Sequence, residues 1–438
     1  MLYYVIGRSK ISYYYNNEDT LVAVPSVSAE PDGDAPFGNE CRRALDKFLS
    51  IAQKLGFDTV NYDNYAGSAQ LGSGKPELGI LGHLDVVPVT ADDWATPPFT
   101  MTIKDGKAFG RGTIDDKGPT VAALYAMKAV QDAGLLNKPV RLIVGCSEET
   151  GSELDIEHYM KCAEMPPMVF TPDAEFPLIN GEKGMIRGEF TQAFADDILV
   201  SLDAGTVVNA VPSKATAVVK NIDMAKLPQI PQLTAEKEGS TVKLTCTGKA
   251  AHASTPADGE NALTMLIGVL AELGAEPMKQ LADIFKHGEC TFTTANGGAL
   301  TYVFSVAEYD GKTFTGKFDI RYPFGSTKEH IFGRITPVFE KLGYKISFPT
   351  ANNPHYVDEN SRFVQTLLKA YHEETGLEAA CQTCGGGTYV HEIDGGVAFG
   401  PEFPGENSNL HSSDEFISID NFLKCAKIYA RAIAELCG

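Results

Sequence analysis

Histidine and carboxylate side chains stand close together in four short segments of the chain, in combinations that could hold a metal ion. The segments are Gly82-His83-Leu84-Asp85, Ile114-Asp115-Asp116, Ser147-Glu148-Glu149 and Thr171-Pro172-Asp173. A mixed set of imidazole and carboxylate donors suits zinc, manganese or cobalt better than calcium or magnesium. Adjacent carboxylates also repel each other unless a cation or a proton lies between them. Together, the four segments predict a transition-metal site.

Each segment alone also fits a simpler interpretation. His83 and Asp85 could form a structural pair, and Asp115-Asp116 could cap the helix that follows them. Glu148-Glu149 could be a solvated acidic turn. The metal hypothesis therefore depends on whether the fold brings the segments to one place.

The elements beside these segments are those of a sheet covered by helices. Three segments follow short apolar runs, which are predicted as buried strands, and Asp115 precedes a predicted helix. The runs are 77–82, 140–146 and 168–171, and the helix is 118–133. The alternation predicts an α/β catalytic domain with a mostly parallel sheet flanked by helices. Because the carboxyl ends of parallel strands meet at one edge, we expect the four segments to lie there together.

A different pattern occupies the middle of the chain. Strands with exposed alternation and two clear helices predict an inserted α+β lid domain. The strands are 216–220, 240–245, 301–306 and 313–320, and the helices are 260–274 and 326–343. With 438 residues, the chain exceeds the roughly 250–300 at which a single core stops growing. We expect residues 1–184 and 357–438 to form the catalytic domain and 185–356 to form the lid.

Composition excludes several classes of protein. A formal charge of −20 repels phosphate backbones and anionic lipids, so we expect no nucleic-acid partner and no membrane partner, whereas cations are attracted. Met1–Lys10 has no leader-like pattern, and no run approaches the roughly 20 apolar residues of a membrane span. Nine scattered cysteines indicate free thiols and a cytoplasmic location. Cys381 and Cys384 form one C-x-x-C pair, which cannot close a four-thiolate site.

The order of the motifs resembles a known family. The strings are G-H-L-D-V-V-P from Gly82, R-G-T-I-D-D-K-G-P from Arg111, S-E-E-T-G from Ser147, P-D-A-E from Pro172 and L-H-S-S-D-E from Leu410. They are similar to those of the dinuclear zinc metallopeptidases, which include bacterial Xaa-His dipeptidases, carnosinase, and acetylornithine and succinyl-diaminopimelate deacylases. The likeness runs from about Thr20 to the C-terminus. The strings D-D-K-G-P and G-G-G-T-Y resemble the Xaa-His dipeptidase branch most.

The resemblance implies a ligand set for two zinc ions, with manganese or cobalt as alternatives. Asp115 would bridge both ions, His83 and Asp173 would complete the first, and Glu149 and His411 the second. Two divalent cations, three carboxylates and a bridging hydroxide sum to zero charge. The resemblance also implies that Asp85 supports His83, and that the peptide bond between Asp115 and Asp116 is cis.

The same resemblance implies a reaction. A metal-bridged water would hydrolyse the amide bond of a dipeptide or short peptide, with Glu148 as the general base. In the lid, His252 would stabilise the oxyanion, and Asn209 and Arg321 would contact the substrate, Arg321 through a fork to its terminal carboxylate. Without the resemblance, His252 is an ordinary loop histidine and Arg321 could form a strand-end salt bridge.

A glycine run near the C-terminal part adds further candidates. In Gly385-Gly386-Gly387-Thr388, backbone N–H groups could approach an anion closely, which makes Gly386, Gly387 and Thr388 candidate substrate contacts. A plain turn is the alternative. The run lacks the Lys-Ser/Thr of a phosphate loop. After G-G-G-T-Y, Val390-His391 stands where relatives have a small residue and arginine, so His391 could contact a carboxylate or simply pack.

Two other functions stay open at this point. An N-acyl amino acid deacylase, specific for acetyl or succinyl groups, would use the same metals with a different acyl pocket. A catalytically inactive metal-binding scaffold would keep the ligands alone. Glu148, which proton transfer needs and ligation does not, argues against the scaffold. We expect a small-molecule substrate, a dipeptide or an N-acyl amino acid, and a chain that is a monomer or a homodimer.

Overall fold

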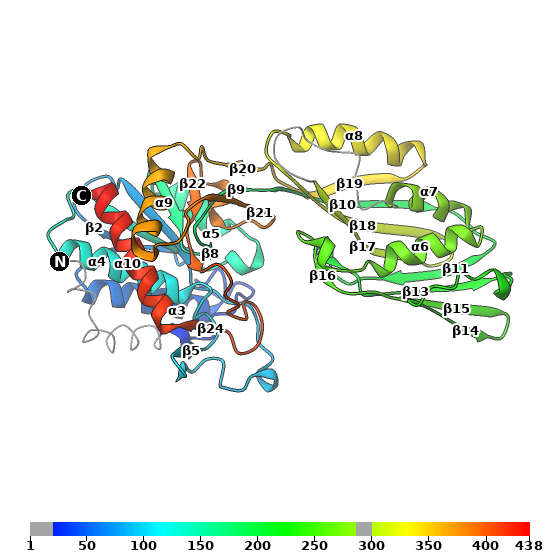
Figure 1. The fold of residues 1–438 in the computed structure, drawn as a ribbon, viewed down its shortest axis with the longest axis horizontal. Helices are drawn as coiled ribbons and strands as arrows, with labels where there is room; N and C mark the ends of the chain where they lie inside the picture. Colours follow the sequence, from blue (N-terminus) through cyan, green and yellow to red (C-terminus); the bar gives the residue numbers. More distant parts are fainter. Residues whose placement is uncertain (1–20, 286–299) are drawn as a thin grey trace. The chain divides into compact units, whose positions relative to one another are not determined.

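The computed structural model describes residues 21–285 and 300–438, and the chain forms two compact units (Figure 1). Unit 1 comprises Met1–Gly181, Tyr356–Thr383 and Gly387–Gly438, and unit 2 comprises Glu182–His355 and Cys384–Gly386. The expectation drawn from Met1–Lys10 falls on residues that lie outside the described ranges.

The sheet of unit 1 has a parallel centre and antiparallel edges. Its strand order is β1-β2-β6-β3-β7-β22-β9-β20, with β21 beside β9. The four central strands β6, β3, β7 and β22 are parallel, whereas β1, β2 and β9 pair antiparallel with their neighbours. The strands are β1 (Asp58–Tyr62), β2 (Ala66–Leu71), β3 (Leu78–His83), β6 (Val140–Gly145), β7 (Met168–Thr171), β9 (Leu178–Glu182), β20 (His355–Tyr356), β21 (Cys381–Cys384) and β22 (Gly396–Ala398).

Helices cover both faces of this sheet. One face packs into a single apolar core with α3 (Asn39–Lys54), α4 (Lys117–Asp132), α9 (Arg362–Thr375) and α10 (Ile419–Cys437). A Cβ atom on Gly67 of β2 would lie 2.7 Å from the Leu45 side chain of α3, so position 67 of the strand faces this core. Gln70 of β2 points the other way, where Arg141 links it to Tyr159 of α5 (Leu154–Cys162). The predicted α/β class with helices on both faces is confirmed.

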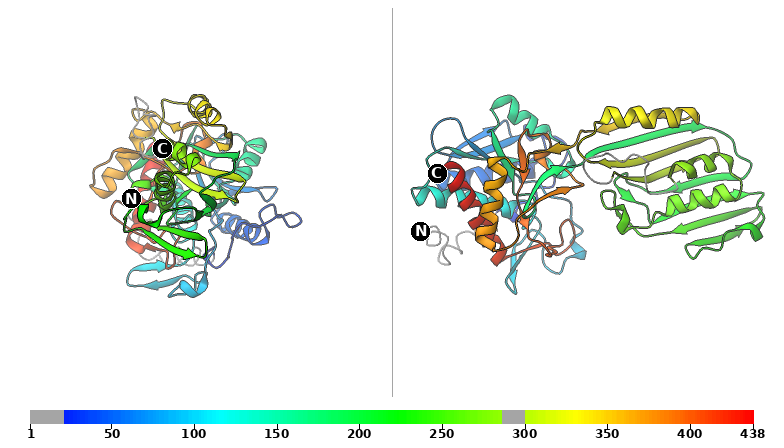
Figure 2. Two further views of the ribbon diagram at one scale, coloured as in Figure 1. Left: turned by 90° about the vertical axis from the view of Figure 1, so that its right-hand side faces the viewer. Right: turned by 45° about the horizontal axis from the view of Figure 1, so that its top comes forward.

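Unit 2 is built on an antiparallel sheet of eight strands, in the order β14-β15-β13-β11-β17-β18-β10-β19. Figure 2 gives two further views of the ribbon. The strands are β10 (Gly184–Ala193), β11 (Leu199–Ala204), β13 (Lys214–Lys220), β14 (Leu233–Glu238), β15 (Thr241–Thr247), β17 (Thr301–Tyr309), β18 (Thr313–Tyr322) and β19 (Lys345–Ala351). A second core joins one face of the sheet to α6 (Ala262–Glu272), α7 (Glu276–Phe285) and α8 (Lys328–Lys341). Unit 2 is therefore α+β, as predicted for the inserted domain.

Short elements complete the two units. In unit 1, β4 (Thr102–Lys104), β5 (Lys107–Phe109) and β24 (Phe416–Ser418) form one small sheet, and β8 (Ala174–Glu175) pairs with β23 (Pro401–Glu402). In unit 2, β12 (Ala210–Val211) pairs with β16 (Ala251–His252). The turns η3 (Glu148–Thr150) and η6 (Tyr389–Glu392) are single turns of 3₁₀-helix.

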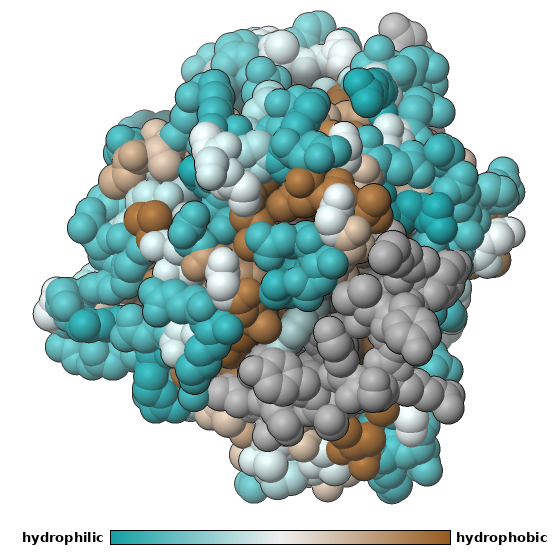
Figure 3. All heavy atoms as spheres, turned by 90° about the vertical axis from the view of Figure 1, so that its left-hand side faces the viewer, coloured by the Kyte–Doolittle hydropathy of each residue, from teal (hydrophilic) through white to brown (hydrophobic). Residues whose placement is uncertain are grey.

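The surface of unit 1 and the lengths of the helices can be examined for apolar regions. The face of unit 1 in Figure 3 is largely hydrophilic, with smaller apolar areas. Over residues 21–285 and 300–438, no helix combines the length and the apolar character that crossing a bilayer requires.

Candidate metal centre

The parallel strands of unit 1 bring the predicted ligand segments to one edge of the sheet. His83 is the last residue of β3 and pairs in register with Gly145, the last residue of β6. Glu148 and Glu149 follow β6 in η3, and Asp173 follows β7 by two residues. Asp115 lies just before the amino end of α4, where the positive end of the helix dipole favours a carboxylate. Four chain segments therefore end around one point.

Asp115 lies between two histidines. Its Oδ1 is 2.9 Å from His83 Nε2, and its Oδ2 is 2.8 Å from His411 Nε2. His83 Nε2 is also 3.5 Å from Asp173 Oδ2, and His411 Nε2 is 3.1 Å from Glu149 Oε2. The structure thus brings all five predicted ligands together as two groups that share one carboxylate, which is the arrangement that a bridging ligand requires.

Burial and mutual repulsion shift the pKa values in this cluster. Burial raises the pKa of the Glu148, Glu149 and Asp173 carboxyls, and neighbouring carboxylates add to the rise. Contacts with Asp115 and Glu149 raise the pKa of His411 to about 10. Without a cation, the histidines would hold protons to balance the carboxylates. The cluster therefore needs added positive charge at neutral pH.

The donor set fits two divalent cations. The oxygen and nitrogen atoms face one another at 2.8 to 3.5 Å, as ligands around a common ion do. Ligand atoms of His83, Glu148 and Asp173 also lie within 4.8 Å of one another, as do those of His83, Asp115 and Glu149. Neutral imidazole and ionised carboxylate are the forms that bind zinc, manganese or cobalt, so metals would take the place of the imidazole protons.

Asp85 supports more than one ligand. Its carboxylate accepts hydrogen bonds from the backbone N–H groups of Glu148, at 3.2 Å, and Glu149, at 3.0 Å. Its Oδ1 also lies 3.4 Å from His83 Nδ1, and its backbone oxygen lies 3.1 Å from the same nitrogen. Contacts of this kind fix the tautomer of a metal-binding imidazole. Asp85 therefore connects His83 to the segment that carries Glu148.

The residue after Asp115 is held as tightly. The Asp115–Asp116 peptide bond is cis, as the resemblance implied. Asp116 Oδ2 accepts from the His83 backbone N–H at 3.2 Å and from the Thr120 hydroxyl at 2.9 Å. A Cβ atom at Gly82 would lie 2.1 Å from the Thr120 hydroxyl oxygen, so glycine is required there.

Glu415 connects the His411 loop to the Asp115 loop. Its carboxylate forms a buried ion pair with Arg111 and accepts from the backbone N–H groups of Gly112, at 2.9 Å, and Ile114, at 3.1 Å. Sequence reasoning gave Glu415 and Arg111 no role, although both stand within the strings that carried the resemblance. Their presence in those strings was the feature of the sequence that could have marked them as part of the site.

A second buried network holds the segment of the proposed base. The Tyr389 hydroxyl donates to Asp155 Oδ2 and accepts from the Ser147 backbone N–H at 3.3 Å. The same Asp155 oxygen accepts from the Cys146 backbone N–H at 2.6 Å. This network fixes the two residues that precede Glu148. Sequence reasoning missed Asp155 altogether, because its partner lies 234 positions away.

Removing the Tyr389 hydroxyl tests this network. Tyr389→Phe is expected to lower kcat about 10- to 100-fold with metal content retained, because the segment before Glu148 loses a fixed contact. The free energy of unfolding should fall by about 1.5–3 kcal/mol, the usual range for a hydrogen bond to a charged group. Steady-state kinetics and denaturant melts measure both. Tyr344→Phe is a matched control, since no described residue hydrogen-bonds the buried Tyr344 hydroxyl; equal losses in both variants would remove Tyr389 from this role.

Two of the predicted substrate residues of unit 2, Asn209 and His252, lie on neighbouring segments. The Ala253 backbone N–H donates to the Asn209 carbonyl at 2.9 Å, where β12 pairs with β16. The Ser254 backbone N–H donates to His252 Nδ1 at 3.2 Å, and the Ser254 hydroxyl lies 2.6 Å from the same nitrogen. A ring nitrogen that accepts from a backbone N–H carries no proton, so His252 holds its proton on Nε2.

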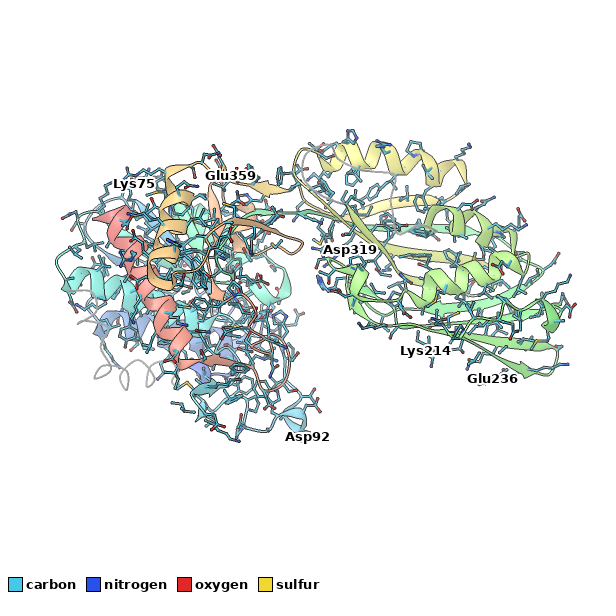
Figure 4. All side chains as sticks on the ribbon, in the orientation of Figure 1. Lys75, Asp92, Lys214, Glu236, Asp319 and Glu359 are labelled. Atoms are coloured by element: carbon cyan, nitrogen blue, oxygen red, sulfur yellow. The ribbon has the colours of Figure 1, made fainter. Side chains whose placement is uncertain are left out.

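Arg321 forms the salt bridge that the sequence had left as an alternative. Its Nε lies 2.7 Å from Asp319 Oδ1, and its Nη2 lies 3.2 Å from Asp319 Oδ2 (Figure 4, where Asp319 is labelled). Its Nη1 donates to the Gly385 carbonyl at 3.0 Å. This places Arg321 beside the glycine run. Each terminal nitrogen keeps a second N–H, so a carboxylate contact stays a prediction.

Gly385 and Gly386 do not form a nest of backbone donors with each other. Neither Gly385 nor Gly386 has a positive φ, whereas an anion-binding nest alternates right- and left-handed residues. Gly385 is needed for space, because a Cβ atom there would lie 2.7 Å from Ser254 Cβ. The chain passes from unit 2 to unit 1 between Gly386 and Gly387. Contacts of Gly386, Gly387 and Thr388 with a substrate stay predictions, and His391 is a buried residue of η6.

An α/β unit with two histidines and four carboxylates at the carboxyl edge of its sheet, interrupted by an α+β unit, has the features of a metallopeptidase. The family model "Peptidase family M20/M25/M40" matches residues 79–435, and the chain belongs to this family. The resemblance drawn from the motifs is thereby confirmed.

Individual proteins agree with this assignment. The chain is 35% identical over 429 residues to "Putative dipeptidase YtjP" of Bacillus subtilis, covering 92% of each chain. Its fold resembles that of human carnosine dipeptidase 1, with a TM-score of 0.60 at 16% identity over 100% of both chains. It also resembles the YXEP protein of Bacillus subtilis, described as a dinuclear metal-binding peptidase, with a TM-score of 0.58 at 10% identity over 98% and 99% of the chains.

Proposed function

We propose that this chain is a dipeptidase that uses two divalent cations to hydrolyse the amide bond of dipeptides or short peptides. Zinc is the proposed metal, with manganese or cobalt as alternatives. The observation that carries the proposal is the Asp115 carboxylate, which turns one oxygen to each of two histidines. The names of the relatives support a dipeptide substrate.

In this proposal, the metals and Glu148 divide the work. Two cations at this site would supply Lewis acidity and lower the pKa of water, which amide hydrolysis needs. Glu148 takes up a proton and passes it to the leaving nitrogen as general base and then general acid. In the metal-free site, burial together with the negative charge of Asp173 raises the pKa of Glu148. Asp85 keeps the Glu148 backbone in place.

His252 is proposed to stabilise the oxyanion. Its proton sits on Nε2, since the Ser254 backbone N–H donates to Nδ1, so Nε2 is a donor rather than an acceptor. One such donor is worth about 2.7–4 kcal/mol of barrier. Asn209 precedes the strand that pairs with the strand of His252, which supports its assignment to the same substrate.

Arg321 is proposed to bind the terminal carboxylate of the dipeptide. Arg321→Lys keeps the charge beside buried Asp319 and removes the planar fork, so the fold should be preserved. We expect KM for free dipeptides to rise about tenfold or more and KM for their C-terminal amides to stay nearly unchanged. Steady-state kinetics on matched pairs of free and amidated dipeptides measure this. An equal change for both substrates would leave Arg321 with a structural role only.

A substrate panel separates the proposal from its rivals. Dipeptides with varied side chains are compared with N-acetyl and N-succinyl amino acids on the zinc-loaded protein. The proposal predicts higher kcat/KM for dipeptides. Preference for the acylated amino acids would indicate a deacylase, and absence of turnover with full metal content would indicate the inactive scaffold.

A further inference from the structure

A second cluster of side chains of metal-ligand types lies in unit 1, and none of them is among the ligands proposed around Asp115. Asp63 Oδ2 is 2.9 Å from His158 Nε2, and Cys162 Sγ is 3.5 Å from the same nitrogen. Ligand atoms of the three residues all lie within 4.8 Å of one another. None of them takes part in the catalytic proposal. One carboxylate, one imidazole and one thiol are all ligand types that zinc accepts.

Rigid local structure presents these side chains to one another. Asp63 and Asn64 both have positive φ, and the Tyr65 backbone N–H donates to the Tyr62 carbonyl at 3.0 Å. These features define a tight turn between β1 and β2, in which three residues separate the last pair, Tyr62 and Ala66. His158 and Cys162 stand four residues apart in α5, so they share one face of the helix. The cluster therefore joins a tight turn to the last turn of a helix.

Ring stacking sets the orientation of the imidazole. The Tyr65 ring lies over the His158 ring with centroids 4.3 Å apart and planes 17° apart. The next helix residue, Tyr159, packs edge-on against Tyr62 at 5.0 Å. These contacts hold both sides of the cluster without using Nε2. Only 26% of the His158 side chain is exposed, whereas Asp63 is 77% exposed and can adjust its position.

The contacts at Nε2 favour a cation over hydrogen bonding alone. An imidazole nitrogen carries at most one proton, so it makes a linear hydrogen bond to only one of two neighbours. Asp63 and Cys162 both converge on this nitrogen. A metal ion bound by all three groups would satisfy the nitrogen, the carboxylate and the thiolate together, and the thiol proton would pass to solvent.

The spacing also suits tetrahedral zinc. Bond lengths of about 2.0–2.1 Å to nitrogen and about 2.3 Å to sulfur place the two atoms about 3.5 Å apart in a tetrahedron. The observed Nε2–Sγ distance is 3.5 Å. The Asp63 oxygen, at 2.9 Å, would move out by a few tenths of an ångström, which its exposure allows. We infer that Asp63, His158 and Cys162 bind one zinc-like divalent cation, with water as the fourth ligand.

Cadmium titration of the metal-free full chain tests the inference. Cadmium bound to thiolate absorbs in the ultraviolet, and the five ligands proposed around Asp115 include no sulfur, so the absorbance reports on thiolate sites alone. We expect one cadmium ion per chain to produce the absorbance and zinc to abolish it. Cys162→Ala should remove the signal, and Asp63→Asn should raise the midpoint concentration about tenfold or more. Cys381→Ala is the matched control and should keep the signal.

The outcomes separate this site from the proposed function. Absence of a thiolate signal in the wild-type chain, a signal that survives Cys162→Ala, or an unchanged midpoint in Asp63→Asn would each overturn the inference. Cys162 and Asp63 are exposed, so the variants should fold, and far-ultraviolet circular dichroism checks this. None of these results depends on whether Glu148 or Asp115 has the role proposed above.

Discussion

Glu148→Gln is expected to lower kcat by about 10²–10⁴-fold while the metal content per chain stays that of the wild-type protein, with two ions beside Asp115. The amide keeps the size of the side chain but cannot take a proton from water and return it to the leaving nitrogen. Because Asp85 binds the Glu148 segment through backbone N–H groups, the segment should stay in place. Steady-state kinetics, with metal content measured by mass spectrometry, give both quantities.

Glu149→Gln is the contrasting variant. Glu149 Oε2 lies 3.1 Å from His411 Nε2, so this neighbour is proposed as a ligand rather than a base. We expect it to lose metal affinity, with activity partly restored by excess zinc. Glu148→Ala should behave as Glu148→Gln does. Near-normal turnover in either Glu148 variant would remove Glu148 from the role of general base.

Asp115→Ala is expected to abolish turnover and to prevent both ions from binding. A bridging ligand binds both metal ions, so its loss weakens the binding of both. Zinc should raise the melting temperature of the wild-type chain, because a ligand at 100 times its Kd stabilises the folded state by about 2.7 kcal/mol. When both chains also carry Cys162→Ala, which removes the zinc site inferred above, the Asp115→Ala chain should show almost no such rise. Thermal melts with and without zinc, after chelator treatment, measure the difference.

Asp132→Ala provides the matched control for that experiment. Asp132 is the last residue of α4, the helix that Asp115 precedes, and it pairs with Lys128 at the surface. Its replacement should leave the zinc-dependent rise unchanged. One ion retained at full affinity in Asp115→Ala would contradict the bridging role.

The edge of the unit 1 sheet that carries the proposed metal ligands could be predicted from the sequence, because the patterns that indicate it lie within short segments. The strands before His83, Glu148 and Asp173 are continuous apolar runs, which is how fully buried parallel strands read. Once three such strands are parallel, their following residues must converge. The structure places those three residues, together with Asp115 and His411, within contact distance.

Elements without a continuous apolar run were harder to predict. Strand β10 contains Gly184 and Gly188 and alternates buried with half-buried residues, so it has no compact apolar stretch. A Cβ atom at Gly188 would lie 2.1 Å from the ring of Phe318, its cross-strand partner, so the glycine makes room for that ring. Sequence analysis of one strand cannot anticipate what its partner requires.

Supporting contacts between distant residues were also beyond the sequence. Tyr389 and Asp155, or Arg111 and Glu415, are hundreds of positions apart, and nothing local connects them. The same holds for Arg321, whose fork is occupied by Asp319 two residues away on β18. Spacing placed the two on one face of a strand but did not show that they pair.

The most direct measurement is anomalous diffraction from crystals of the zinc-loaded chain, collected at the zinc absorption edge. We expect two peaks beside Asp115, roughly 3.5–4 Å apart as in other two-metal sites, with one carboxylate oxygen directed at each. A single peak at this position, or two peaks of which Asp115 contacts only one or neither, would contradict the account.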